Sequence, residues 1–273
     1  MNLEDHVGDV LRKARQAAGV SAETAARAAG LAANELGELE AAGRTRKPAN
    51  WLDLAAVLKL NGPKLKAIAE GWLPEARDLS LWRELRLITT ERGGNRVNCG
   101  LIWDEVSREA ALFDTGWDAQ PVFEFVEENG LALNHLFLTH SHQDHVAALE
   151  PIRHRFPKLL LHSGSKSALP QHRNKPSEFV HLGSLRISHR DVPGHAEDGV
   201  VYLVGGWPED APHVAFVGDT VFAGSLATGF QSATLLEQKV RDEIFSLPPE
   251  TLLCPGHGPV TTVAEERDHN PFF

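Results

Sequence analysis

Histidine and aspartate gather in one short segment of this chain, in a spacing that suits metal binding. Three histidines and one aspartate stand between Thr139 and His145, where the sequence reads Thr-His-Ser-His-Gln-Asp-His. The apolar run Leu136–Leu138 directly before them predicts a strand that ends at the cluster. Zinc and other borderline metals bind imidazole and carboxylate groups well. The segment therefore predicts metal ligands at one mouth of a sheet.

Three further residues of ligand type follow, each beside glycine or proline. His195 comes after Pro-Gly, Asp219 stands between glycine and threonine, and His257 has a glycine on each side. Glycine and proline favour tight turns, which can expose the side chain between them. The full set suffices for two metal ions and consists of His140, His142, Asp144, His145, His195, Asp219 and His257.

This ordered set resembles the metallo-β-lactamase superfamily, and within it the glyoxalase II-like hydrolases. The turn Asp114-Thr115-Gly116, the segment Gly218–Ser225 and the closing stretch Thr261–Phe272 fit the same pattern. The resemblance covers roughly residues 79–273. It implies an α/β fold, a four-layered αββα sandwich, with a dinuclear metal site.

The resemblance also implies a role for each candidate ligand. The first metal would be held by His140, His142 and His195, and the second by Asp144, His145 and His257, with Asp219 bridging them. A water between two cations roughly 3.5–4 Å apart loses its proton near neutral pH and can attack a carbonyl or phosphoryl centre. Asp144 would also orient this nucleophile, which makes it the catalytic candidate. We expect two divalent ions, with Zn²⁺ the first choice and Mn²⁺ or Fe²⁺ the alternatives.

Three functions remain open at this level. The first is hydrolysis of a small thioester or ester by a glyoxalase II-like enzyme. The second is a persulfide dioxygenase, which would hold one iron through His140, His195 and Asp219. The third is a transcriptional regulator that senses a metabolite. Acyl-homoserine lactonases also resemble this site, but they use a tyrosine beyond the bridging aspartate, and here Tyr202 precedes that aspartate. This departure counts against a lactonase. Among the three functions above we favour hydrolysis of a thioester or ester.

Two other features have competing interpretations. Asp114 either orients a ligand histidine through a hydrogen bond or caps a turn. The loop Ser163–Ser177 carries four basic side chains that either face an anionic substrate or lie in solvent: Lys166, His172, Arg173 and Lys175.

Residues 1–74 are expected to form a separate, all-helical domain, with residues 75–273 as the second. Apolar residues recur there at helical spacing, and glycines end three helices before Pro48 opens a fourth. This domain resembles the phage-repressor type of helix-turn-helix. The resemblance rests on Leu11-Arg12, Gly19-Val20-Ser21, Ala29-Gly30-Leu31, Leu39-Glu40, Gly43-Arg44 and Pro48.

The expected recognition helix departs from that of a DNA reader. Ala32 and Ala33 stand where polar base-contacting residues are usual, Glu35 and Glu38 would face phosphates, and Asn34 remains as one base reader. Residues 1–75 hold ten basic and ten acidic side chains, whereas DNA-binding domains are more often basic. DNA binding and a scaffold role in a homodimer both stay open.

After the expected linker Pro74–Ser80, strands alternate with helices, as a layered α/β fold requires. The expected strands are Leu85–Thr89, Val97–Trp103, Ala110–Phe113, Leu133–Leu138, Leu159–His162, Val200–Val204, Val214–Val217 and Thr251–Leu253. The expected helices are Gln120–Glu128, Val146–Phe156, Thr234–Ser246 and Thr262–Arg267.

The composition limits which cellular compartments and which classes of partner are expected. With 42% hydrophobic and 23% charged residues, the 273-residue chain is ordinary for a globular protein. A net charge of −10 argues against coating nucleic acid or an anionic membrane as its main task. No apolar run reaches the ~20 residues of a membrane span, and the acidic start is unlike a secretion signal. We expect a cytoplasmic protein that acts on a small molecule.

Overall fold

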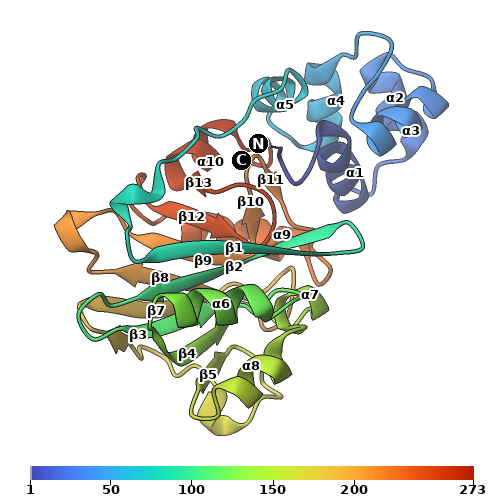
Figure 1. Cartoon of the computed structure of the whole chain (residues 1–273). Coiled ribbons are helices and arrows are strands. Elements are labelled where there is room, and N and C mark those ends of the chain that lie inside the picture. Colours follow the sequence, from blue (N-terminus) through green and yellow to red (C-terminus); the bar gives the residue numbers. More distant parts are fainter. Residues whose placement is uncertain (1) are drawn as a thin grey trace.

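The structure is a computed structural model that describes residues 2–273. A cluster of short helices comes first in the chain, and a two-sheet sandwich with outer helices follows (Figure 1). Both predicted folds, the helix-turn-helix domain and the mixed α/β sandwich, are confirmed. The boundary between residues 74 and 75 remains our proposal, and it falls between the last helix of the cluster and the first turn of the sandwich.

The first domain is built from five helices that bury one apolar side each. Its elements are α1 (Val7–Ala17), α2 (Ala22–Ala29), α3 (Ala33–Ala42), α4 (Trp51–Leu58) and α5 (Gly62–Ala69). Leu11, Leu39 and Leu54 come from three different helices and are fully buried in a common core. Gly30 and Gly43 end α2 and α3 in the left-handed conformation, which glycine adopts without steric cost. The glycine signals therefore predicted these helix ends.

One expectation for this domain was wrong, and one helix was missed. The fourth helix begins at Trp51 and not at Pro48, because the Asn50 side chain accepts a hydrogen bond from the backbone N–H of Asp53 and caps it there. The fifth helix, α5, was not predicted at all. Asn61 caps it and Pro63 occupies its first turn, which is a clear start signal in retrospect.

The first sheet of the sandwich has five strands in sequential order. They are β1 (Leu85–Arg92), β2 (Asn95–Trp103), β3 (Glu109–Phe113), β4 (Ala132–Leu138) and β5 (Leu160–Ser163). The first three pair antiparallel, whereas β3, β4 and β5 run parallel. Parallel neighbours need crossover helices, which here are α6 (Gln120–Glu128) and α8 (Leu149–Arg155).

The second sheet has the order β13-β12-β9-β8-β7-β6. Its strands are β6 (Val180–Leu182), β7 (Leu185–Asp191), β8 (Val200–Gly205), β9 (Val214–Gly218), β12 (Leu252–Pro255) and β13 (Thr261–Thr262). The sequence did not reveal β6 and β7. Since β8 is antiparallel to both β7 and β9, and β12 is parallel to β9, the strands β7, β9 and β12 end at the same edge.

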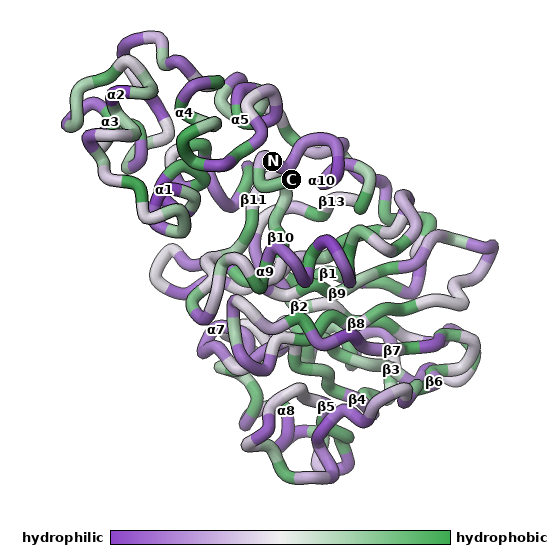
Figure 2. Tube along the Cα trace, turned by 180° about the vertical axis from the view of Figure 1, so that it is seen from behind, coloured by the Kyte–Doolittle hydropathy of each residue, from purple (hydrophilic) through white to green (hydrophobic). Residues whose placement is uncertain are grey.

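Aromatic side chains fill the space between the two sheets. The ring of Phe113 in β3 stacks on that of Phe216 in β9, with 3.8 Å between the centroids. Gly100 in β2 is required opposite them, because a Cβ there would lie 2.0 Å from the Phe216 ring. Helices cover both outer faces, with α9 (Ala233–Lys239), the π-helix η4 (Val240–Ile244) and α10 (Val263–His269) on the second sheet. Figure 2 shows hydrophobic residues along the strands between these layers.

The helical domain is held to the sandwich by specific contacts. The backbone N–H of Asn61 donates to the Pro271 carbonyl at 2.7 Å, and Lys64 Nζ donates to that of Phe273 at 2.9 Å. Lys13 Nζ in α1 donates to the Leu226 carbonyl at 2.9 Å. Helices α1 and α5 therefore face the sandwich, while α2 and α3 lie on the far side (Figure 1). Among residues 2–273, no helix is both long and apolar enough to cross a membrane.

Candidate metal centre

All seven candidate ligands lie at one edge of the sandwich. Strands β4, β7, β9 and β12 end there, and each is followed by part of the set. The two sheets meet at this edge, where the Val200 N–H donates to the Thr139 carbonyl at 2.8 Å. Gly218 is required beside them, since a Cβ there would lie 2.4 Å from the Thr139 hydroxyl. Segments far apart in sequence are thus joined where their polar side chains converge.

The side chains form overlapping triads with metal-ligand spacing. Three groups each place their ligand atoms within 4.8 Å of one another: His140, His142 and His195; His140, His145 and Asp219; Asp144, His145 and His257. The first and third groups are the two triads expected from the sequence, and the second contains the expected bridge. Asp219 Oδ1 lies 3.2 Å from His145 Nε2, and its Oδ2 lies 3.6 Å from His195 Nε2 and 3.5 Å from His257 Nε2.

Several buried atoms in this cluster have no hydrogen-bond partner in residues 2–273. They are His140 Nε2, His145 Nε2 and Asp219 Oδ1. His145 Nε2 and Asp219 Oδ1 lie 3.2 Å apart without forming a hydrogen bond, and His140 Nε2 has no hydrogen-bond partner within the described residues. Buried polar atoms are nearly always satisfied, so this arrangement fits a group from outside the protein. A divalent cation satisfies imidazole nitrogen and carboxylate oxygen together. The donor set therefore fits metal ions.

The ring nitrogens that face away from the cluster are held by acceptors. His195 Nδ1 lies 2.8 Å from the Thr228 carbonyl, and His257 Nδ1 lies 2.5 Å from the Arg96 carbonyl. A carbonyl can only accept, so Nδ1 carries a proton in both rings, and Nε2 is the nitrogen that faces the cluster. Such outer partners fix the tautomer and orientation of metal-binding histidines. These rings are preorganised for metal coordination.

Asp114 orients a candidate ligand rather than merely capping a turn. Its Oδ2 lies 2.8 Å from His145 Nδ1, and its Oδ1 accepts the backbone N–H of Thr139 at 2.8 Å. The residue has φ 58°, a conformation that is uncommon outside glycine. Strain of this kind persists where the surroundings determine it and is frequent at functional sites. Asp114 thereby connects the turn after β3 to the start of α7 (Gln143–Val146).

The aspartates of the cluster favour positive charge on the histidines beside them. Burial opposes a charge on His145, but the carboxylates of Asp114 and Asp219 outweigh burial and raise its pKa to about 10. Burial acts likewise on His257, where Asp144 and Asp219 raise the pKa to about 11. Without a metal, protons on these rings neutralise the aspartates. Divalent ions would displace such protons on binding.

His140 behaves differently from these two rings. Burial, reinforced by the neighbouring His145, lowers the pKa of His140 well below its ordinary value. Its ring is therefore neutral at pH 7, which is the form that coordinates metals. For Asp219, burial favours the protonated form, but His145 and His257 together keep its pKa well below the ordinary value. Asp219 is the ionised carboxylate at the centre of the set.

A cavity of about 480 Å³ opens in front of His142 and His195. The basic loop, for which a substrate-facing and a solvent-exposed position were both open, lies only partly at this cavity: Lys166 lines the cavity, and it pairs with Glu197 at 2.9 Å. Arg173 instead donates to the Ala168 carbonyl within its own loop. The opening of this cavity is therefore polar, but Lys166 is already paired with the Glu197 carboxylate.

One residue at the mouth escaped the sequence analysis. The ring of Phe230 lies 5.3 Å from that of His195 and 5.9 Å from that of His142, centroid to centroid. The Phe230 side chain is 71% exposed, so its ring is an apolar surface at the opening of the cavity. Residues 226–230 form no motif, so no local signal could have identified it.

Comparison with known proteins agrees with this geometry. Residues 92–257 match the family model described as the metallo-beta-lactamase superfamily, and residues 6–67 match a helix-turn-helix domain. The chain is 29% identical over 201 residues to the hydroxyacylglutathione hydrolase GloC of Haemophilus influenzae, covering 64% of this chain and 92% of that protein.

Two solved structures are also similar. One is ETHE1 from Myxococcus xanthus, with a TM-score of 0.59, 30% identity, and coverage of 68% of this chain and 83% of that one. The other is TTHA1623 in a di-iron-bound form, with a TM-score of 0.53, 27% identity, and coverage of 68% of this chain and 100% of that one.

Proposed function

This chain belongs to the metallo-β-lactamase superfamily, and we propose that it is a metal-dependent hydrolase that cleaves a small thioester or ester at a dinuclear site. The fold implies a divalent metal, and the related hydrolases support hydrolysis as its use. The observation that carries the proposal is the position of Asp219 between two histidine groups, with buried ligand-type atoms that nothing in residues 2–273 satisfies.

Each of the seven residues has a proposed role. One metal would lie among His140, His142 and His195, a second among Asp144, His145 and His257, and Asp219 would bridge them. Two divalent ions at such a site supply Lewis acidity and an activated water. The likeness to a structure in a di-iron-bound form supports two ions, and leaves Fe²⁺ or Mn²⁺ beside Zn²⁺ as candidates.

Asp144 is the proposed catalytic residue of the chain itself. Its Oδ2 lies 3.2 Å from His257 Nε2 and 4.0 Å from His145 Nε2. Burial favours its neutral form, yet His257 and His145 lower its pKa to about 2. Asp144 is therefore ionised throughout the neutral range. An ionised carboxylate at the mouth accepts a hydrogen bond from the attacking water and so orients it.

The test is a reconstitution and substrate screen. Protein stripped with a chelator would be loaded with Zn²⁺, Mn²⁺ or Fe²⁺, and assayed on thioesters, lactones and phosphodiesters. We expect turnover of a small thioester or ester that needs metal and falls at least 100-fold in Asp144→Ala. Equal turnover by metal-free protein would contradict the proposal.

A persulfide dioxygenase is the second candidate. The likeness to ETHE1 from Myxococcus xanthus favours it, at 30% identity over most of the sandwich domain. It would use His140, His195 and Asp219 around one iron. Here His140 shares one ligand group with His195 and another with Asp219, and Asp219 Oδ2 lies 3.6 Å from His195 Nε2. Oxygen consumption with glutathione persulfide by the iron-loaded protein, without hydrolysis of any ester, would favour this candidate.

We also propose that the helical domain can bind DNA. Helices α2 and α3 lie away from the sandwich, so the sandwich does not cover the expected recognition helix (Figure 1). The model of a helix-turn-helix domain matches this region. A gel shift at low salt with the DNA upstream of its own coding sequence tests this, because phosphate contacts are strongest there. The homodimer stays a prediction.

A further inference from the structure

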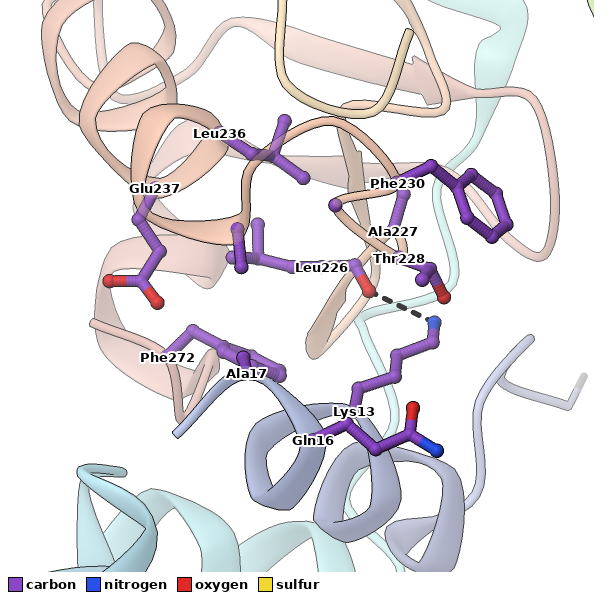
Figure 3. A pocket seen from close by; sticks show the side chains of 12 residues that line it. Lys13, Gln16, Ala17, Leu226, Ala227, Thr228, Phe230, Leu236, Glu237 and Phe272 are labelled. Carbon is purple, nitrogen blue, oxygen red and sulfur yellow. Dashed lines mark hydrogen bonds between the residues drawn. The ribbon is translucent and has the colours of Figure 1, made fainter. Parts of the chain in front are cut away.

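A second cavity lies where the helical domain meets the sandwich. Its volume is about 260 Å³, and α1 forms one side of it while residues 226–230 and α9 form the other (Figure 3). Leu226, Leu236 and Phe272 line it from the sandwich, and Ala17 of α1 lines it from the helical domain. A cavity of this size holds a short chain but is smaller than the usual pocket for a whole ligand.

One side chain is shared by this interdomain pocket and the cavity at the metal centre. Phe230 lines both the interdomain pocket and the cavity in front of His142 and His195. Its ring, which lies beside two of the candidate ligands, therefore offers an apolar surface between the two cavities. The segment also touches the centre directly, since the Thr228 carbonyl accepts from His195.

The charged groups around the pocket argue against an anionic occupant. Lys13 Nζ already binds the Asp5 carboxylate and the Leu226 carbonyl, and Asp5 also accepts the Ser225 hydroxyl at 2.6 Å. The remaining ionisable group of the lining is Glu237, a half-buried carboxylate that would repel an anion. An uncharged apolar group packs against Leu226, Leu236 and Phe272 and leaves the Lys13 pairs intact.

We propose that the substrate carries an uncharged apolar arm, such as an acyl chain, which leaves the metal centre over Phe230 and ends in the interdomain pocket. This inference rests on the proposed hydrolase, and it gives the helical domain a second task. Helix α1 would form part of the substrate site, so substrates with a longer acyl chain would be preferred.

The experiment uses a homologous series of neutral thioesters. N-acetylcysteamine thioesters from acetyl to octanoyl would be assayed with the metal-loaded full chain. Each added methylene should raise kcat/KM about threefold until the pocket is full, because burial of one CH₂ in an apolar site has this effect. The variant Ala17→Trp, which fills the pocket from an exposed position, should remove this dependence, so that the octanoyl compound is hydrolysed no faster than the acetyl compound.

A second pocket variant and a control variant test whether the effect of Ala17→Trp comes from filling the pocket. Gln16→Trp narrows the same pocket from the adjacent exposed position and should act in the same direction. Ala41→Trp lies on the exposed face of α3, far from the pocket, and should keep the wild-type dependence. A chain-length dependence that survives both pocket variants would overturn the inference.

A binding experiment tests the interdomain pocket independently of the proposed hydrolase activity. Octanamide, which is neutral and not a substrate, would be titrated calorimetrically into metal-free wild type and Ala17→Trp. Binding to wild type at least tenfold tighter than to the variant supports the pocket even if no thioester is ever hydrolysed. Equal binding to the two proteins, or thioester turnover that does not depend on chain length, would overturn the arm while leaving a metal-dependent hydrolase intact.

Discussion

At the metal centre, buried histidine and aspartate atoms lack partners within the described protein, whereas the charged groups beside α3 satisfy one another. Glu35 accepts the backbone N–H of Ala32 at 2.8 Å and pairs with Lys47 at 2.6 Å. The exposed positions of α3 carry Asn34 and Glu38 among alanines and glycine. The metal centre is thus incomplete without a cation, whereas α3 offers little positive charge to the phosphates of DNA.

This difference shows that the presence of a fold and the presence of a working site are separate properties. Both regions have the expected architecture, but only the metal centre has side chains whose placement costs free energy unless a ligand arrives. The helix-turn-helix fold can be retained for its packing alone, because α1 and α5 hold the sandwich. The substitutions below either remove what the metal centre needs or supply what α3 lacks.

The largest effect is expected from His140→Ala. His140 is 3% exposed, and its Nε2 has no partner in residues 2–273. Its loss should remove metal from the centre and lower kcat/KM on the order of 10³-fold, since metal stabilisation of the reacting group is worth several kcal/mol. Metal content and turnover measure this. The control His154→Ala alters an exposed histidine outside the cluster, and equal behaviour of the two variants would refute the role of His140.

A pH-dependent effect is expected near the junction of the helical domain with the sandwich, away from both regions compared above. Glu266 is fully buried beside the Gly224 backbone, and burial raises its pKa to about 7 against the hydrogen bonds from Asn270, Thr261 and that backbone. The folded chain therefore binds this proton more tightly than the unfolded chain. The resulting stability is complete below about pH 4.5 and is lost as the pH rises through about 7.

Urea unfolding of wild type and Glu266→Gln at pH 5 and pH 8 measures this loss. Relative to the variant, wild type should lose about 3 kcal/mol of unfolding free energy between the two values. The comparison cancels the histidines of the metal centre, which titrate alike in both proteins. A difference between the proteins that does not change with pH would show that Glu266 keeps an ordinary pKa.

A smaller effect is expected from Asp114→Asn. The amide keeps the size of the side chain but loses the charge that polarises His145 through its Nδ1–H. Metal affinity should fall about 10- to 100-fold, as for other outer partners of metal-binding histidines. Competition with a chromogenic chelator measures it, with Asp210→Asn as a control at an exposed position. Unchanged affinity would reduce Asp114 to a structural residue of its turn.

The smallest effect should come from Glu38→Lys on α3. Replacing one negative charge by a positive one should tighten nonspecific DNA binding about threefold at 0.1 M salt and steepen its salt dependence. Fluorescence anisotropy with a short duplex follows the change, and Glu250→Lys on the sandwich is the matched charge control. If both lysines act equally, α3 has no special contact with DNA.

The sequence predicted the features that are encoded locally. The candidate ligands follow strand ends or stand in glycine-rich turns, and these signals act within a few residues, so His140, Asp219 and His257 could be singled out. Phe230 could not, because it reaches His195 only after β7 and the segment beyond β11 (Ser225–Leu226) are brought together. The interdomain pocket likewise exists only once α1 docks on the sandwich.

Helix boundaries show the same limit. Residues 234–246 were expected to form one helix, but the structure has α9 followed by the π-helix η4, because the packing of Val240 and Ile244 on the second sheet overrides the regular spacing. Residues 146–156 likewise divide between the end of α7 and α8. Tertiary contacts, which no single segment contains, determine such boundaries.

The metal content of the purified chain tests the central claim most directly. Protein prepared without chelator or added metal would be examined by elemental analysis, alongside His140→Ala. About two divalent ions per chain in wild type, and a clear loss in the variant, are predicted for the dinuclear hydrolase. One iron per chain would shift the account to oxygen chemistry. Absence of bound metal, even after supplementation with Zn²⁺, Mn²⁺ and Fe²⁺, would contradict it.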